Sequence, residues 1–171
     1  MVNKIIIQHE LVNGVTVDVT PLSPYTRAEI TEKAKEIYPD PDPAPYQKAE
    51  TNVLGEDVKY IDPAKEDDWK RAQLDVRETR LQWAYDEMLR LSVSCNGDTK
   101  AVLEAYSPDI EKLRKSGLSL PEDDWEAILF HCLLTWNSDR NLVIKAIMQT
   151  APLTDGEVVG AFKFFRIKVS E

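Results

Sequence analysis

The chain is poor in the residues that build metal sites and disulfide frameworks. Its 171 residues include two cysteines, Cys95 and Cys132, and two histidines, His9 and His131. Neither cysteine belongs to a CxxC pair, and no zinc-ligand spacing is present. We expect two reduced thiols, no metal and no cofactor. His131 and Cys132 are adjacent, so a helix would point them about 100° apart, which argues against a nucleophile–base pair.

Long apolar runs and basic segments are also missing. No run approaches the roughly 20 apolar residues that span a bilayer, and the apolar part of MVNKIIIQHE is too short for a signal peptide. The net charge is −9, and no third of the chain is basic. This charge disfavours nucleic acid and anionic membranes as partners. We therefore expect a cytoplasmic protein that meets other proteins, with homo-oligomerisation left open.

Signatures of catalysis are equally scarce. The six glycines are scattered, so they form no phosphate-binding loop, and neither GxSxG nor HExxH occurs. The acidic runs Glu66-Asp67-Asp68 and Glu122-Asp123-Asp124 lie where helices are expected to begin, and the helix dipole accounts for them. A pair of catalytic carboxylates brought together only by the fold stays an alternative. The sequence favours a protein that is not an enzyme.

What the sequence does contain is one long, uninterrupted helical segment. Asp62-Pro63 is a helix-start signal, and neither Gly nor Pro follows until Gly97. We predict a helix from Asp62 to about Val93, on the order of 45 Å long. Its apolar residues form two edges, Trp69, Ala72, Val76 and Trp83 on one and Leu74, Leu81, Tyr85 and Met88 on the other. Such a helix can contact two neighbours, either two parts of its own protein or one part and a partner chain.

The stretch before this helix is predicted to form a small β module. Residues 4–8 and 15–20 are β-branched or alternate in polarity around Asn13-Gly14, which favours a β-hairpin. A helix is expected from Ser23-Pro24 to Tyr38. Residues 39–45 then carry Pro at every second position, which is typical of an extended spacer, with a docking strip for an aromatic groove as the alternative. Two short strands, at 51–54 and 58–61, would give the hairpin its partners.

The remainder is predicted to be helical. The expected helices cover 99–106, 108–115, 121–136, 139–150 and the segment that opens at the capping box Thr154-x-x-Glu157. The predicted fold class is α+β, mainly α, with an N-terminal β-hairpin or small antiparallel sheet and a helical bundle organised on the long helix. The predicted domains are a β-hairpin and helix module at 1–61, with its Pro-rich spacer at 39–47, and a helical bundle at 62–171.

One stretch of the C-terminal half suggests a family. It runs DWEAILFHCLLTWNSDRNLVIKAIMQTAPLTDGEVVGAFKFFRIKV: a Trp-bearing amphipathic helix, a helix ending in IMQ, a TAPLT linker and a terminal helix opened by TDGEV. With the Pro/Asp-rich spacer and the acidic helix upstream, this resembles tail-assembly chaperones and small tail-morphogenesis proteins of long-tailed bacteriophages. The resemblance covers about residues 60–167, and its motifs are loose patterns of residue type. The N-terminal β segment departs from it.

The resemblance implies a non-enzymatic function, which is to shield the long helical tape-measure protein and bring tail-tube subunits to it. The partner surface would combine the second edge of the long helix with the aromatic C-terminal helix. Its expected residues are Leu74, Leu81, Tyr85, Met88, Phe162 and Phe165. Two alternatives stay open, a structural component of the virion tail or neck and a host-directed adaptor protein.

Overall fold

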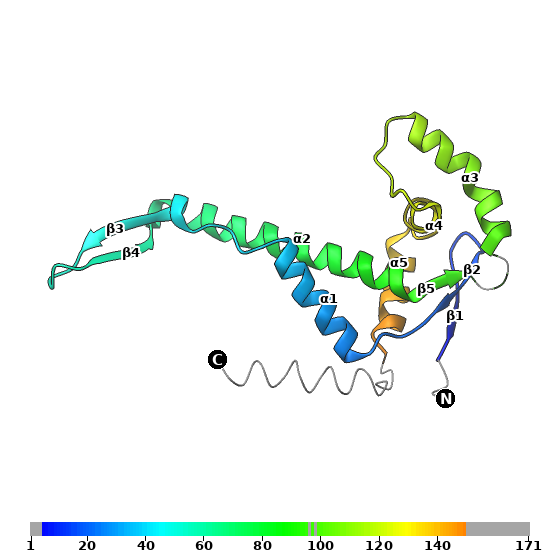
Figure 1. Cartoon of the computed structure of the whole chain (residues 1–171), viewed down its shortest axis with the longest axis horizontal. Coiled ribbons are helices and arrows are strands. Elements are labelled where there is room, and N and C mark those ends of the chain that lie inside the picture. Colours follow the sequence, from blue (N-terminus) through cyan, green and yellow to red (C-terminus); the bar gives the residue numbers. More distant parts are fainter. Residues whose placement is uncertain (1–4, 96, 98, 150–171) are drawn as a thin grey trace. The chain divides into compact units, whose positions relative to one another are not determined.

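The computed structural model describes residues 5–95, 97 and 99–149, and its fold is α+β, mainly α, as the sequence predicts. Figure 1 shows the helices and the two small sheets. The strands are β1 (Ile7–Glu10), β2 (Thr16–Val19), β3 (Gln47–Thr51), β4 (Asp57–Ile61) and β5 (Val93–Cys95). The helices are α1 (Pro24–Ile37), α2 (Glu66–Ser92), α3 (Thr99–Lys115), α4 (Asp124–Ile128) and α5 (Asn137–Ile147).

The long helix forms as predicted because its start is capped. Asp62 accepts a hydrogen bond from the backbone N–H of Ala64 at 3.0 Å, and a single 3₁₀ turn, Pro63–Lys65, leads into α2. Glu66, Asp67 and Asp68 occupy the first turn of α2, where the helix dipole favours negative charge. The helix then continues for 27 residues.

The N-terminal hairpin is confirmed, but its predicted partners are wrong. β1 pairs antiparallel with β2 around a turn in which Gly14 has φ of +81°, a conformation that favours glycine. The third strand of that sheet is β5, which follows α2 directly, and the sheet order is β1-β2-β5. β3 and β4 form a separate two-stranded sheet, so the segment around Gly55 does not extend the first one.

Two helical boundaries also differ from the prediction. Ser107-Pro108 does not start a new helix, because α3 runs through Pro108 from Thr99 to Lys115. A proline removes one amide donor, and Ile110, two residues further along α3, is buried. The expected helix at 121–136 begins at α4 and passes into a π-helical turn, Leu129–Leu133, closed by the 2.8 Å bond from the N–H of Leu134 to the carbonyl of Leu129.

The described residues divide into two compact units. One comprises the residues up to Ala28 together with those from Tyr85 onward, and the other is Glu29–Ala84. The first unit holds the hydrophobic core: its fully buried side chains include Val17, Val19, Leu89, Ile128, Leu129, Leu133, Leu134, Val143 and Ile147. The backbone N–H of Val12, beside the β1–β2 turn, donates to the buried carboxylate of Asp139 on α5 at 3.0 Å. The domain division at residue 61/62 stays a prediction.

Candidate protein-binding surface

The unit Glu29–Ala84 buries few of its side chains. Every residue of this unit is described, and the buried ones are Ile30, Ala34, Asp62 and Ala84. Six of its large hydrophobic side chains are exposed and only Ile30 is buried, whereas a folded segment normally covers more of its apolar surface. The exposed set is Ile37, Val53, Leu54, Val58, Leu74 and Leu81. This unit therefore carries the candidate binding surface.

One edge of α2 is covered from within the unit. The Pro-rich segment after α1 packs along it, and the ring centroids of Tyr46 and Trp69 lie 5.3 Å apart. At the other end of the segment, Arg80 donates from Nε to the carbonyl of Tyr38 at 2.7 Å and pairs with Asp40 at 2.9 Å. The apolar residues of this edge are accordingly only partly exposed; they are Trp69, Ala72, Val76 and Trp83. This is the internal neighbour expected for the first edge.

Arg80 holds that segment on the helix, so Arg80→Ala should loosen it. We expect the free energy of unfolding to fall by about 1–2 kcal/mol, because a charge-assisted hydrogen bond to a carbonyl is lost. The exposed carboxylate of Asp40 adds little. Urea denaturation followed by tryptophan fluorescence measures this change. Arg77→Ala is the matched control on the same helix, and equal losses in the two variants would contradict the assignment.

The second edge of α2 lies open. Leu74 is 51% exposed, Leu81 is 45% exposed and Tyr85 is 42% exposed. Leu74 and Leu81 are seven residues apart, so they lie on one stripe of α2 within the unit Glu29–Ala84, whereas Tyr85 is the first residue of α2 that belongs to the other unit. A stripe of this kind is the surface that an amphipathic partner helix covers. These three of the expected partner residues are thus accessible.

The other three expected partner residues are either buried or outside the described residues. Met88 continues the same stripe, but it is 5% exposed and lies in the core of its unit. The expectation that Met88 contributes to an exposed surface is therefore wrong, since neighbours distant in sequence cover this turn of α2. Phe162 and Phe165 lie outside the described residues.

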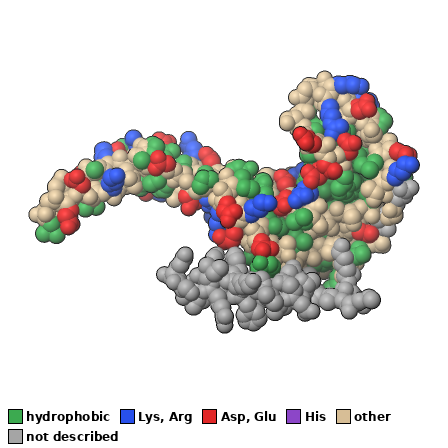
Figure 2. Space-filling view, in the orientation of Figure 1, with side chains coloured by type: hydrophobic (Ala, Val, Ile, Leu, Met, Phe, Trp, Pro, Cys, Tyr) green, Lys and Arg blue, Asp and Glu red, His purple; other side chains and the backbone are tan. Residues whose placement is uncertain are grey.

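The hairpin β3–β4 carries apolar residues that the sequence-based prediction did not assign to the surface. Its loop presents Val53, which is fully exposed, and Leu54, which is 79% exposed. Figure 2 shows hydrophobic side chains at the outer end of this hairpin. Two neighbouring large apolar residues beside a loop glycine were the available signal, because turn residues are normally polar or Gly.

Asp62 fastens the base of the hairpin to the start of α2. Its carboxylate accepts from the N–H of Ala64 and pairs with Lys48 of β3 at 3.2 Å. The backbone hydrogen bond, with Lys48 adding to it, lowers the pKa of Asp62 below its ordinary value. Because the fold favours the carboxylate form, this contribution is present above the unfolded-state pKa of about 3.9. It is lost as the pH falls through the lower folded-state pKa.

We therefore expect Asp62→Asn to destabilise the protein at neutral pH and to have a smaller effect as the pH falls below about 4, because the unfolded chain then begins to bind a proton that the folded carboxylate still excludes. Thermal unfolding of both proteins across this pH range measures the difference. A gap in melting temperature that stays constant with pH would show that the charge of Asp62 plays no part.

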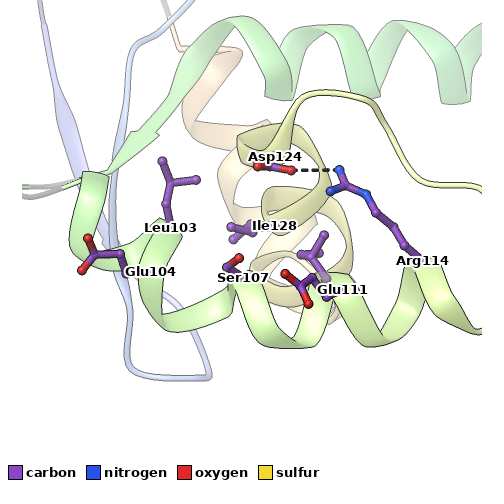
Figure 3. Close-up of a pocket in the computed structure, with 8 residues that line it drawn as sticks. Leu103, Glu104, Ser107, Glu111, Arg114, Asp124 and Ile128 are labelled. Carbon is purple, nitrogen blue, oxygen red and sulfur yellow. Dashed lines mark ion pairs between the residues drawn. The ribbon is translucent and has the colours of Figure 1, made fainter.

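A groove between α3 and α4 is one candidate for a small-molecule site. It has a volume of about 270 Å³, and Ile110 and Ile128 are buried beneath it. Figure 3 shows Arg114 reaching Asp124, and the two form an ion pair at 2.9 Å. The other lining acids, Glu104 and Glu111, pair with Lys100 and Lys115 on the same helix. Because its carboxylates are already paired with cations, we interpret the groove as part of the contact between α3 and α4, with charged residues at its rim.

The thiols do not resemble catalytic nucleophiles. Burial raises the pKa of the Cys95 thiol and of the Cys132 thiol, whereas a reactive cysteine needs a lowered pKa. His131 and Cys132 both line a shallow depression with Tyr106 and Asp109. Across residues 5–95, 97 and 99–149, no three His, Cys, Asp or Glu side chains gather closely enough to hold a metal ion.

Comparisons with known proteins assign neither a family nor a function to the chain. Set against protein-family models, curated proteins and solved structures, the chain shows no match. Among the described residues, no helix has the length and apolar character needed to cross a membrane. The exposed apolar stripe of α2 and the outer end of the β3–β4 hairpin are the two candidate binding surfaces among the described residues.

Proposed function

We propose that this chain is a non-enzymatic assembly chaperone of a bacteriophage tail that binds the tape-measure or tail-tube proteins in the cytoplasm of the bacterial host. The observation that carries the proposal is the open stripe of Leu74 and Leu81 on a helix whose opposite edge is already covered by its own chain. The resemblance of residues 60–167 to tail-assembly chaperones supplies the identity of the partner.

The chemistry of the stripe suits a helical client. Leu74 and Leu81 are seven residues apart, which is the repeat with which two helices pack side by side. The resemblance implies a long and helical client, and a helical client can present an apolar stripe of its own. Covering such a stripe prevents aggregation while assembly proceeds.

The charge of the chain suits a holding function as well. A net charge of −9 keeps a protein soluble while it exposes apolar side chains. Charged residues of both signs lie near the stripe: Asp67 and Glu78 are acidic, and Lys70 and Arg77 are basic. Mixed charges beside an apolar seam favour a partner with a complementary pattern over non-specific association.

A tagged copy expressed with its neighbouring genes tests the proposal. We expect the pull-down to recover a very long helix-rich protein or a tail-tube subunit, identified by mass spectrometry. Purified virions should then lack the chain, because an assembly chaperone leaves before the particle is complete. Recovery of neck or baseplate proteins with retention in virions would favour a structural component. Recovery of host proteins alone would favour an adaptor.

A further inference from the structure

The outer end of the β3–β4 hairpin is a rigid loop. Asn52 closes it, because its side-chain oxygen accepts from the N–H groups of Leu54 at 2.9 Å and Glu56 at 3.0 Å. The N–H of Asn52 donates to the carbonyl of Glu56 at 2.8 Å, and the N–H of Gly55 donates to the carbonyl of Asn52 at 3.0 Å. Gly55 has φ of +81°, which suits glycine at this position. These hydrogen bonds fix the loop conformation without any contribution from the side chains of Val53 and Leu54.

These two side chains stabilise nothing in their own unit. Val53 is fully exposed and Leu54 is 79% exposed, so the loop holds them out in solvent. Below the loop, Thr51 donates to Asp57 at 2.9 Å and Tyr60 donates to Glu50 at 2.5 Å, which braces the two strands. A braced loop that presents two apolar side chains loses little conformational entropy when they are buried by a partner.

The charges around the loop restrict what that partner is. Between Lys48 and Lys59 the hairpin carries Glu50, Glu56 and Asp57 and no basic residue. An anionic membrane is repelled by these acids, and so is a second copy of a chain with a net charge of −9. A protein pocket with an apolar floor and lysine or arginine at its rim is attracted by both features of the loop.

We infer that the β3–β4 loop is a docking knob that inserts Val53 and Leu54 into an apolar pocket with a basic rim on a partner protein. The knob is separate from the α2 stripe, and the inference shares with the proposed function only the premise that the chain binds proteins. The knob would give the unit Glu29–Ala84 a second point of attachment, with a chemistry different from that of the stripe.

A photo-crosslinking amino acid placed at Leu54 tests the knob in cells that express the full chain with its neighbouring genes. The matched control carries the same probe at Ala49, an exposed position on β3 of the same hairpin. We expect one adduct that is several-fold more abundant at position 54, and mass spectrometry should place it on an apolar segment flanked by lysine or arginine. Equal adducts at the two positions, no adduct, or adducts confined to the chain itself would overturn the inference.

The double variant Val53→Asp/Leu54→Asp provides a second readout. Its thermal melt should match the wild type, because the two side chains are exposed, while co-purification of the crosslinked protein should fall at least tenfold. Unchanged co-purification would contradict the knob, and so would flotation of the wild type with phosphatidylcholine vesicles containing phosphatidylglycerol. If the adduct maps to a protein unrelated to tails, the knob stands and the proposed function fails. If Leu81→Asp removes binding of a tail protein while the double variant binds it as the wild type does, the proposed function stands and the knob fails.

Discussion

Leu81→Asp should abolish binding of the helical partner and leave the fold intact. Leu81 is 45% exposed, so the folded chain loses little packing when its side chain changes. In the complex, a carboxylate would be buried in an apolar seam without a cation, and such changes at the centre of an interface cost about 2 kcal/mol or more, or roughly 30-fold in affinity. Quantitative pull-down measures the binding, and circular dichroism measures the fold.

Leu142→Asp is the matched control. Leu142 is 49% exposed on α5, so the substitution has the same chemistry and similar exposure on a different helix. We expect binding within about twofold of the wild type, because surface substitutions outside an interface change binding little. Similar losses in the two variants would show that Leu81→Asp acts through general solubility or stability, and the assignment of the stripe would fail.

The largest effect on stability is expected for Leu89→Ala. Leu89 lies two turns beyond Leu81 on α2, but it is 1% exposed and belongs to the core of its unit. Truncating a buried leucine removes its transfer free energy and leaves a cavity, which costs about 2–5 kcal/mol. For a chain of this length, we expect the melting temperature to fall by about 5–15 °C.

Leu81→Ala is the control for this loss, since it makes the same substitution on the same helix. Alanine is a strong helix former and the side chain is half exposed, so we expect a change of less than about 1 kcal/mol. Thermal unfolding followed by circular dichroism compares the two variants. Equal melting temperatures would mean that α2 is not divided into a buried end and an open stripe.

The sequence predicts the elements of this fold whose signals are local. Asp62-Pro63 marks the start of the long helix, and Asn13-Gly14 marks the first hairpin, because capping and tight turns depend on neighbouring residues. The two apolar edges of α2 also follow from spacing alone. The spacing of Leu74 and Leu81 places them on a common edge for that reason.

The features that escaped prediction depend on residues distant in sequence. β5 has three residues and no alternating pattern of its own, so only pairing with β2 makes it a strand. Met88 has the spacing of the open stripe, yet the core of its unit covers it. Helical periodicity identifies an edge of a helix, but it does not say which turns of that edge a distant segment will bury.

The hairpin loop escaped prediction for another reason. Sequence patterns treat a turn as polar, and the segment at 51–54 was predicted as a strand because Val53 and Leu54 are apolar. In the structure β3 ends at Thr51, and both residues belong to the loop. Side-chain hydrogen bonds from Asn52 fix this loop, and they leave no pattern in the sequence beyond the Asn itself.

Methyl NMR of the leucines, recorded with and without the co-purified partner, tests the central claim most directly. Leu74 and Leu81 lie on the open stripe, whereas Leu142 lies on α5 with similar exposure. The account predicts that the methyl resonances of Leu74 and Leu81 shift or broaden on binding while those of Leu142 stay in place. Perturbation of Leu142 with unchanged Leu74 and Leu81 would contradict it, because the partner would then bind a different surface.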